Sequence, residues 1–575
     1  MSYARTRFAC PWHALLVVMG GALTSSTFAA EALADGSAYD VVICGGSAAA
    51  LAAAFTAADE GAKVALLEPT DWIGGQFTAS AVPAVDEAWH RIADPKTGEV
   101  LLDVAKIARD PRNMTPFLRD TLAEIGNPGR GWVSRYCFEP KRILDLAFLP
   151  RERNLRDRLT VYRDTVVKSV EVDLSSRRIV SVTAIQRTAK PTIEAGGYDR
   201  PLSQDLPDWY SATPSDRYDK RVLTFGSNTK GSTVFIDATE WGELLALSGA
   251  SYLVGAEVED GDLHGNDRCG QAITYGFVMR YHEKPVDDHP QYPTVPDLGF
   301  GSYRDRTDAW SQVWTYRRLK ADADEPNPGD LSLQNWGYDP RTNESGNDYP
   351  NGYLFLSREE TAKQLDDWQG GVDLKTLAAA ERQALAWHDW FRQAAPEGIH
   401  PDCFTIDGKV LGTTHGLSKV PYVRDTRRSI GLDGFVLEFR HLSGPAEQKT
   451  GTRFDDRVAL GAYAADIHPL ADCKYPAATR ADSHTLPYYL PYRALTNRDF
   501  DNLLVAGKTM AQTFLTNSAT RLHPSEWSSG CAAGTAAAYL ARTGKTTLDG
   551  LEGIDEIQAI VGEHTPTEWT IDAQD

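Results

Sequence analysis

The chain has 575 residues and a formal net charge of −20, with 42% hydrophobic and 24% charged residues. This is the composition of a globular protein that is long enough for two or more structural lobes, each with a substantial core. Because so negative a chain repels polyanions, we expect no nucleic-acid partner.

The first 30 residues differ in character from the rest of the chain. Arg5 and Arg7 precede an apolar core over residues 14–23, and small residues follow at the spacing of a cleavage site. This order predicts a secretory signal peptide over residues 1–30 and a periplasmic or secreted protein without a transmembrane anchor after cleavage. The alternative is an N-terminal membrane anchor, although the apolar run is too short to span a bilayer.

Residues 39–69, YDVVICGGSAAALAAAFTAADEGAKVALLEP, predict a strand, a tight turn, a helix and a second strand. Residues 41–44 and 64–67 are short apolar runs, which are typical of strands buried on both faces of a parallel sheet. Residues 48–58 are small and strongly helix-forming. The order and the length are those of the βαβ unit of a dinucleotide-binding domain.

The turn of this unit departs from the usual G-x-G-x-x-G fingerprint, because its residues are GGSAAA. Gly45 keeps the tight turn, and the backbone N–H of Ser47 can face a phosphate from the helix N-terminus. Glu68 ends the second strand, where a carboxylate accepts hydrogen bonds from a ribose diol and repels the 2′-phosphate of NADP. We therefore predict a nucleotide site at Gly45, Gly46, Ser47, Ala50 and Glu68; the alternative is an ordinary α/β unit without a ligand.

Later segments continue the α/β pattern. Residues 159–184 alternate as in a β-meander, and residues 190–232 are rich in turn formers, which indicates a surface insertion. Near the C-terminus, the apolar run 501–507 is followed by a helix of small residues over 524–542. A nucleotide domain that begins at the N-terminus and closes at the C-terminus favours FAD over NAD, because NAD domains are usually continuous.

Six cysteines follow the predicted signal peptide, and none forms a C-x-x-C pair, which argues against a thiol–disulfide reductase. Cys44 and Cys531 lie in a predicted buried strand and helix, so we expect inert core thiols. The others can form disulfides in an oxidising compartment, with the pairing left open: Cys137, Cys269, Cys403 and Cys473.

Several segments together resemble one known family. They include DVVICGGSAAALAAA, WIGGQFTASAVPAVDE, VFIDATEWGELLALSGASYLVG and NLLVAGKTMAQTFLTNSATRLHPSEWSSGCAAGTAAA, spread from residue 40 to about residue 540. In this respect the chain resembles bacterial FAD-dependent oxidoreductases of the glutathione-reductase-like superfamily. The resemblance implies an α/β fold, in which a glutathione-reductase-like Rossmann FAD-binding domain carries an inserted α+β substrate domain.

The resemblance also implies a division of the chain. The FAD-binding domain would cover residues 38–260, with the surface insertion near 190–232, and would close with residues 486–545. A substrate or cap domain would occupy residues 261–485, and residues 546–575 would form a helical tail.

Further cofactor contacts follow from the resemblance. It implies that the cofactor is also bound by Gly74, Gly75, Gln76, Val167, Ala238, Thr239, Gly507, Lys508, Arg521 and Leu522. The chain departs from the family at Glu240, where a small residue is common after the Thr. Reduced flavin carries negative charge at its pyrimidine edge, which a helix N-terminus and the cation of Arg521 would stabilise. The alternative for Arg521 is a surface salt bridge.

Removal of a hydride from a substrate usually requires a group that handles a proton. The candidates are His415, His441, His468, His484 and His523. Of these we select His523 and His441, together with Arg521, as catalytic residues; each His has a structural role as its alternative. Arg424, Arg427 and Arg428 can clamp a carboxylate, although an interdomain ion-pair strand is the favoured interpretation. No metal-binding motif is present, so we expect no metal.

The sequence therefore predicts an exported FAD-dependent dehydrogenase or oxidase. Hydride would pass from an alcohol or amine C–H of a small or oligomeric organic substrate to flavin N5, and oxygen or a membrane-linked acceptor would reoxidise the flavin. Two alternatives remain open: a non-catalytic binding protein built on a flavin fold, and an NAD-dependent Rossmann dehydrogenase.

Overall fold

The computed structural model describes residues 38–226, 233–257, 266–286, 307–323, 325–335, 346–471, 473 and 484–571. The predicted signal peptide, residues 1–30, lies outside the described residues. Within them, no helix is long and apolar enough to cross a membrane.

A five-stranded parallel sheet forms the centre of the molecule. In spatial order its strands are β22 (Leu503–Val505), β9 (Val234–Asp237), β1 (Val41–Cys44), β2 (Val64–Leu67) and β5 (Leu159–Tyr162). Both predicted strands of the N-terminal βαβ unit are confirmed, and every residue in them is buried. Burial on both faces explains why these strands are continuous apolar runs. One prediction was wrong: residues 159–162 extend the parallel sheet and do not belong to the meander.

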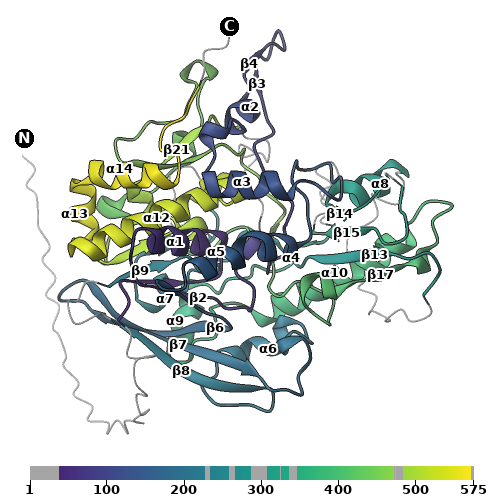
Figure 1. Ribbon diagram of the computed structural model, residues 1–575, viewed down its shortest axis with the longest axis horizontal. Helices are drawn as coiled ribbons and strands as arrows, with labels where there is room; N and C mark the ends of the chain where they lie inside the picture. Colours follow the sequence, from purple (N-terminus) through teal and green to yellow (C-terminus); the bar gives the residue numbers. More distant parts are fainter. Residues whose placement is uncertain are drawn as a thin grey trace, which may run out of the picture.

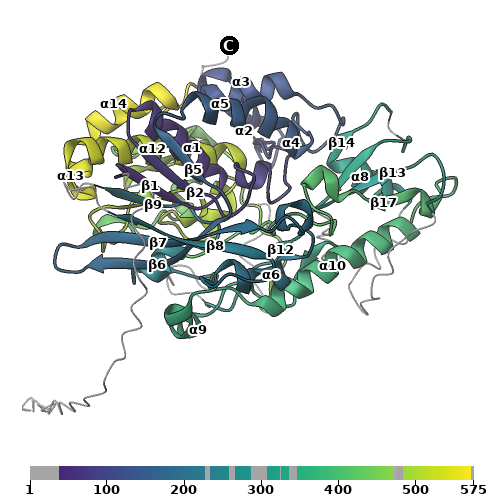
Figure 2. The ribbon, with the colours of Figure 1, turned by 60° about the horizontal axis from the view of Figure 1, so that its bottom comes forward.

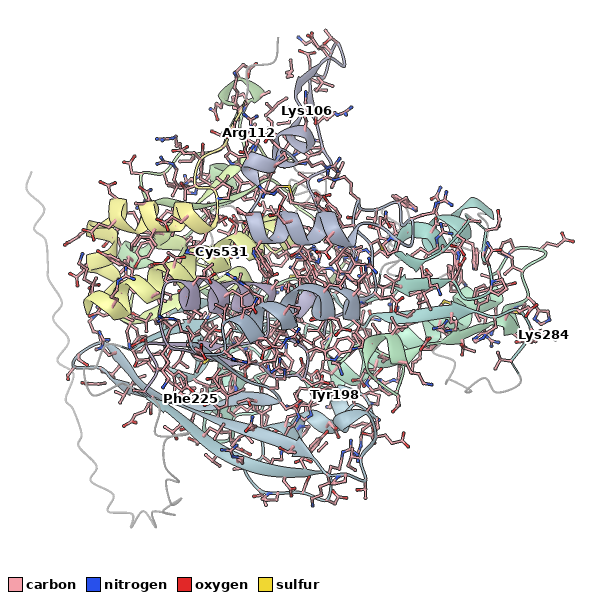
Figure 3. All side chains as sticks on the ribbon, in the orientation of Figure 1. Lys106, Arg112, Tyr198, Phe225, Lys284 and Cys531 are labelled. Carbon is pink, nitrogen blue, oxygen red and sulfur yellow. A yellow bond between two sulfur atoms is a disulfide. The ribbon has the colours of Figure 1, made fainter. Side chains whose placement is uncertain are left out.

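Helices α1 (Ala48–Asp59) and α12 (His523–Thr543) pack side by side against this sheet (Figure 1). Their backbones approach so closely that a Cβ added to Gly530 would lie 2.3 Å from the Ala49 carbonyl oxygen. The Thr56 hydroxyl also donates a hydrogen bond to the Cys531 carbonyl oxygen at 3.1 Å. Figure 3 shows Cys531 within this helical layer. The small residues predicted for both helices are therefore what allows the N- and C-terminal segments to meet.

An antiparallel sheet lies beside the parallel one (Figure 2). Its strands are β6 (Thr165–Asp173), β7 (Arg178–Ala189) and β8 (Tyr218–Gly226), paired in that order. The predicted surface insertion, residues 190–232, forms helix α6 (Leu202–Trp209), whose Leu206 and Trp209 are buried. The prediction was wrong for residues 218–226, which form β8 and pair with β7, and residues 227–232 lie outside the described residues. The insertion thus packs against the rest of the protein through an apolar face.

A second group of elements lies at the far end of the molecule from α13 (Thr547–Glu552) and α14 (Ile554–His564) (Figure 1). It contains an antiparallel sheet, in spatial order β14 (Arg318–Lys320), β15 (Leu331–Gln334), β13 (Phe277–Tyr281) and β17 (Phe404–Ile406). Helices α8 (Thr307–Tyr316) and α10 (Leu374–Gln393) accompany this sheet. Its core is rich in tryptophan, and Trp314, Trp368 and Trp387 are fully buried.

Shorter elements connect these layers. The helices are α2 (Val104–Ala108), α3 (Pro116–Ile125), α4 (Pro140–Ile143), α5 (Leu149–Asn154), α7 (Glu243–Leu247), α9 (Arg358–Gln364) and α11 (Phe514–Thr520). The short strands that matter for the site are β11 (Gly270–Gln271), β12 (Ile273–Thr274), β16 (Asp348–Tyr349), β19 (Arg457–Gly461), β20 (Leu470–Ala471) and β21 (Tyr488–Pro491).

One disulfide joins two distant segments, Cys269 before β11 and Cys473 after β20. The remaining cysteines of the described residues are buried free thiols: Cys44, Cys137, Cys403 and Cys531. The predicted burial of Cys44 and Cys531 is confirmed. The sequence left the pairing open, because nothing in the spacing shows that β11 and β20 are neighbours.

Candidate functional site

A pocket with about 620 Å³ of empty volume opens at the carboxyl ends of β1 and β2. Ligands of open α/β sheets bind at this edge. The pocket is lined by Gly45, Gly46, Leu67, Glu68, Pro69, Thr70, Gly75, Ala79, Ser80, Thr165, Val166, Val167, Trp209, Tyr210, Thr239, Glu240, Trp241, Glu243, Val420 and Pro421. Six of the residues predicted to bind the cofactor are therefore brought together at one cavity: Gly45, Gly46, Glu68, Gly75, Val167 and Thr239.

The turn between β1 and α1 depends on Gly45 and on Ser47. Gly45 has a φ of +120°, and a Cβ there would lie 2.3 Å from the Ala238 carbonyl oxygen. Ser47 caps α1: its hydroxyl accepts a hydrogen bond from the Ala50 N–H at 3.1 Å and donates one to the Ala238 carbonyl oxygen at 2.7 Å. The serine in place of glycine thus ties the turn to β9 at the N-terminus of α1, where the helix dipole favours an anion.

Glu68 lies at the pocket wall and is 1% exposed. Its Oε1 accepts hydrogen bonds from the Thr70 N–H at 2.9 Å and the Thr70 hydroxyl at 2.8 Å, whereas Oε2 has no hydrogen-bond partner among the described residues. Burial raises the pKa of this carboxyl to about 8. A buried acceptor oxygen without a donor fits a ligand that supplies hydroxyl donors, as a ribose diol does.

Aromatic residues of the insertion also line this pocket. Trp209 and Tyr210 are buried, and the Tyr210 hydroxyl donates a hydrogen bond to Glu243 Oε1 at 2.6 Å. The Trp368 indole N–H donates to the same oxygen at 3.0 Å, and burial raises the Glu243 pKa to about 7. The sequence analysis did not predict this wall, because the many turn-forming residues of the segment indicated a surface loop. The two adjacent aromatic residues, Trp209 and Tyr210, were a signal that part of the segment is buried.

The glycine-rich loop after β2 runs along the same cavity. Gly74 has a φ of +110°, and a Cβ on it would lie 2.6 Å from the Phe148 ring. A Cβ on Gly75 would lie 2.7 Å from the Ala48 nitrogen. Both positions therefore require glycine, since any side chain would meet atoms of α1 or the neighbouring ring. The loop continues into Gln76, whose side chain is fully buried.

A buried charged cluster lies where this loop meets the last strand and α12. The Lys508 ammonium is 2.8 Å from Glu240 Oε2 and 3.5 Å from Glu526 Oε2. Glu240 and Glu526 outweigh the cost of burial and raise the pKa of Lys508. Gln76 donates hydrogen bonds to Glu526 Oε2 and to the Arg521 carbonyl oxygen. Glu240, the departure from the family pattern, therefore supplies the counterion of Lys508, and the sequence analysis did not identify Glu526.

Arg521 is buried at the end of α11, one residue before Leu522, the N-cap residue of α12. Its guanidinium donates to the Tyr422 hydroxyl at 2.6 Å, and to the carbonyl oxygen and Oδ2 of Asp466 at 2.9 and 2.8 Å. The alternative of a surface salt bridge is thus wrong for Arg521, whose side chain is 1% exposed.

Further charged side chains extend the network beyond Arg521. His468 lies between two carboxylates, with Nδ1 2.6 Å from Asp348 Oδ2 and Nε2 3.3 Å from Asp466 Oδ2. Arg424 holds the other oxygen of Asp348 at 3.0 Å. His468 and Arg521 outweigh burial and lower the pKa of Asp466 well below its usual range. Of the five histidine candidates, His468 is the one that this network joins to Arg521.

The two selected histidines occupy different surroundings. His523 is fully buried: its Nδ1 accepts a hydrogen bond from the Asp86 N–H at 3.1 Å, and its Nε2 donates to the Val82 carbonyl oxygen at 2.8 Å. Burial lowers the His523 pKa to about 4. Partly exposed His441 accepts from the Glu438 N–H at 3.1 Å and packs beside Phe454. The described contacts of His441 do not bring it together with Arg521.

The three arginines of residues 424–428 are structural ties in this arrangement. Arg427 donates to the carbonyl oxygens of Trp241 and Gly371 at 2.8 and 2.7 Å. Arg428 donates to the carbonyl oxygens of Gln512 and Gly255 at 3.1 and 2.8 Å. The guanidinium N–H groups of these arginines thus donate to backbone carbonyl oxygens of several separate segments. This supports the interpretation of an interdomain strand over that of a carboxylate clamp.

A second cavity, with about 610 Å³ of empty volume, reaches the start of α12. It is lined by Asp86, Glu87, Ala88, Ala108, Arg109, Asn113, Met114, Thr115, Leu118, Leu460, Gly461, Ala462, Tyr463, Pro524, Ser525, Ser528 and Trp569. Arg317 donates to Asp86 Oδ1 at 3.1 Å. Asp86 and Asp466 add to burial in raising the Tyr463 pKa well above its usual value. The cavity therefore borders the polar network that contains Arg521.

The chain matches the model of one protein family, described as FAD dependent oxidoreductase, over residues 40–198 and 219–561. The unmatched stretch, residues 199–218, falls within the predicted insertion. No curated protein matches the chain.

Solved structures give distant likenesses. A p-nitrophenol 4-monooxygenase from Pseudomonas putida DLL-E4 is 13% identical, over 92% of this chain and 86% of that chain, with a TM-score of 0.34. The myxobacterial chondrochloren halogenase is 11% identical, over 93% of this chain and 84% of the halogenase chain, with a TM-score of 0.30. A geranylgeranyl bacteriochlorophyll reductase-like protein from Thermoplasma acidophilum is 11% identical, over 92% of this chain and 82% of that protein's chain, with a TM-score of 0.29.

Proposed function

The chain belongs to the FAD dependent oxidoreductase family, and we propose that it is an exported enzyme that oxidises an alcohol or amine. The family assignment makes it an FAD-dependent oxidoreductase, and it argues against the NAD-dependent and non-catalytic alternatives. The specific reaction, the substrate class and the export are the parts that we propose. The disulfide between Cys269 and Cys473 supports export, because such bonds persist in oxidising compartments.

The residues at the first cavity fit FAD. The adenosine half would bind at the pocket beside Glu68, with its ribose hydroxyls donating to the unpartnered oxygen of this residue. The diphosphate would lie against the turn of Gly45 and Ser47, where the N-terminus of α1 favours anions. Lys508 would supply a cation to it, and Gln76 and Arg521 would border the flavin. The single observation that carries this assignment is the buried, unpartnered oxygen of Glu68 at a cavity beside the α1 turn.

FAD held at this site would supply the hydride acceptor, and residues of the protein would position the substrate and hold its proton. We assign the second cavity to the substrate. Asp86, in its lining, donates its backbone N–H to His523, which follows Arg521 by two residues at the start of α12. There the Asp86 carboxylate would accept a hydrogen bond, and then the proton, from the substrate hydroxyl or amine. Arg317 would hold that carboxylate in place, and Arg521 would stabilise negative charge that develops at the cofactor.

The predicted catalytic histidines take other parts in this proposal. Both nitrogens of His523 are engaged by backbone groups, so it would position the loop that carries Asp86. His468 would link Arg521 to Asp348, because it lies between the carboxylates of Asp348 and Asp466. Oxygen or a membrane-linked acceptor would then remove the electrons.

The test is anaerobic mixing of the purified, FAD-loaded protein with a panel of alcohols and amines, while the flavin absorption band is followed. A substrate of the proposed class bleaches the flavin. In Asp86→Asn, which keeps the shape of the side chain, the protein retains its flavin but bleaching slows by about 10²–10⁴-fold, because the proton acceptor is lost. Equal bleaching rates in wild type and Asp86→Asn would remove Asp86 from the mechanism, and a panel without any bleaching would argue against the substrate class.

A further inference from the structure

Glu526, in the first turn of α12, is a buried carboxylate that the proposed reaction does not use. Its side chain is fully buried. Gln76 donates a hydrogen bond to Oε2, and the Lys508 ammonium lies 3.5 Å from the same atom. The Ala49 backbone N–H, in the first turn of α1, forms a hydrogen bond with the same carboxyl. Glu526 is therefore held at the end of α1 that favours anions.

The Glu526 carboxylate lies beside the first turn of α1. A Cβ built on Gly507 would be 3.0 Å from both the Ala49 Cβ and Glu526 Oε1, so these two atoms flank the same glycine. The backbone N–H of Ala49 acts on this carboxyl and lowers its pKa, although burial has the larger and opposite effect. Helix α1 has no acidic residue of its own in that turn. Glu526 therefore places negative charge at the helix N-terminus that would otherwise attract a phosphate.

The charges around Glu526 leave little room for a further anion. Lys508 is the cation that faces it, and Glu240 shares that cation at 2.8 Å. Gln76, on the loop after β2, faces it as a neutral donor. With both glutamates ionised, this cluster carries one net negative charge, and a diphosphate would add two more. Burial already raises the Glu526 pKa to about 7, so neutralising this residue is the least costly way to relieve the repulsion.

We propose that Glu526 occupies the place of the diphosphate in the flavin-free protein and takes up a proton when FAD binds. The inference rests on the proposed FAD site. The proton comes from solvent and is held at a Glu526 carboxylate oxygen, and no bond of FAD is made or broken. Once Glu526 is neutral, Lys508 is released to pair with the diphosphate. Flavin loading is therefore coupled to pH, and it is favoured where the pH lies below about 7.

The test is calorimetric titration of the flavin-stripped full chain with FAD near neutral pH, in two buffers of different ionisation enthalpy, which gives the protons exchanged per FAD. Glu68 also contributes to the number of protons exchanged, because it loses a proton when it accepts hydrogen bonds from the ribose as a carboxylate. The comparison is therefore between wild type and Glu526→Gln, which is neutral and nearly isosteric. Wild type takes up more protons per FAD than Glu526→Gln, by up to one proton, because only wild type has an ionisable carboxyl at this position.

Affinity gives an independent readout. At about pH 8, Glu526→Gln binds FAD about tenfold more tightly than wild type, and the difference disappears at about pH 6. The control is Glu381→Gln, which removes a buried carboxyl of α10 that accepts hydrogen bonds from Ser203 of α6. This variant exchanges as many protons per FAD as wild type. Equal proton exchange in wild type and Glu526→Gln would overturn the inference and leave the FAD site standing. A chain that binds no FAD would overturn the proposed function itself.

Discussion

Glu68 shows how a single carboxyl at the candidate cofactor site affects the stability of the fold. The unfolded chain titrates this group near 4.5, whereas burial raises its pKa to about 8 in the folded, flavin-free protein. The folded state therefore binds the proton more tightly. Its stability contribution is present below the unfolded pKa and is lost as the pH rises from about 4.5 to about 8.

We predict that Glu68→Gln stabilises the flavin-free protein progressively over this pH range. The melting temperature of the variant, minus that of wild type, rises from about pH 5 to about pH 8, because the neutral amide avoids the buried charge. Thermal unfolding in the absence of FAD measures this difference. Glu447→Gln, at an exposed position, serves as the control and shows no such trend. A difference that stays constant with pH would contradict the burial of an ionisable Glu68.

At the scale of elements, the contact between α1 and α12 joins the N-terminal and C-terminal parts of the chain. Gly530 faces backbone atoms, since its added Cβ would lie 2.3 Å from the Ala49 oxygen and 2.7 Å from its Cα. Backbone atoms cannot rotate away as a flexible side chain does. This close approach explains why a helix so rich in glycine and alanine is used, although glycine weakens helices.

We predict that Gly530→Ala destabilises the protein by about 1–3 kcal/mol, because the helices must separate to admit the methyl group. The matched control is Gly562→Ala in α14, where no atom lies within 4 Å of the added Cβ. That change stabilises the protein by about 0.5–1 kcal/mol through helix propensity. Urea unfolding of both variants measures the two effects. If both alanines stabilise equally, the helices do not pack as closely as described.

The elements also show what the sequence could predict. The strands β1 and β2 and the helices α1 and α12 followed from apolar runs and small residues, which are local signals. The strand β5 was assigned to the meander, because alternation alone does not reveal which sheet a short strand joins. The aromatic wall from the insertion was missed, since turn-forming composition hides residues such as Trp209 that are buried by tertiary contacts.

At the scale of the whole molecule, the candidate site is assembled from segments that lie far apart in the chain. The turn of Gly45 and Ser47 contacts Ala238, and Gln76 reaches Arg521 and Glu526. Local motifs identified Glu68, and the resemblance identified Lys508 and Arg521. Asp466, Tyr422 and Glu526 carry no motif, and their roles follow from contacts across tens to hundreds of residues.

The central claim is that one elongated ligand extends from the Glu68 pocket to Lys508 and Arg521, and the relative affinity for FAD and FMN tests it most directly. Flavin fluorescence titrations of the flavin-stripped protein give both dissociation constants. FAD binds at least about 100-fold more tightly than FMN, because only FAD carries the adenosine ribose that meets Glu68, and Glu68→Ala narrows this gap by weakening FAD alone. Equal affinities for FAD and FMN, or an equal loss of both in Glu68→Ala, would contradict the claim.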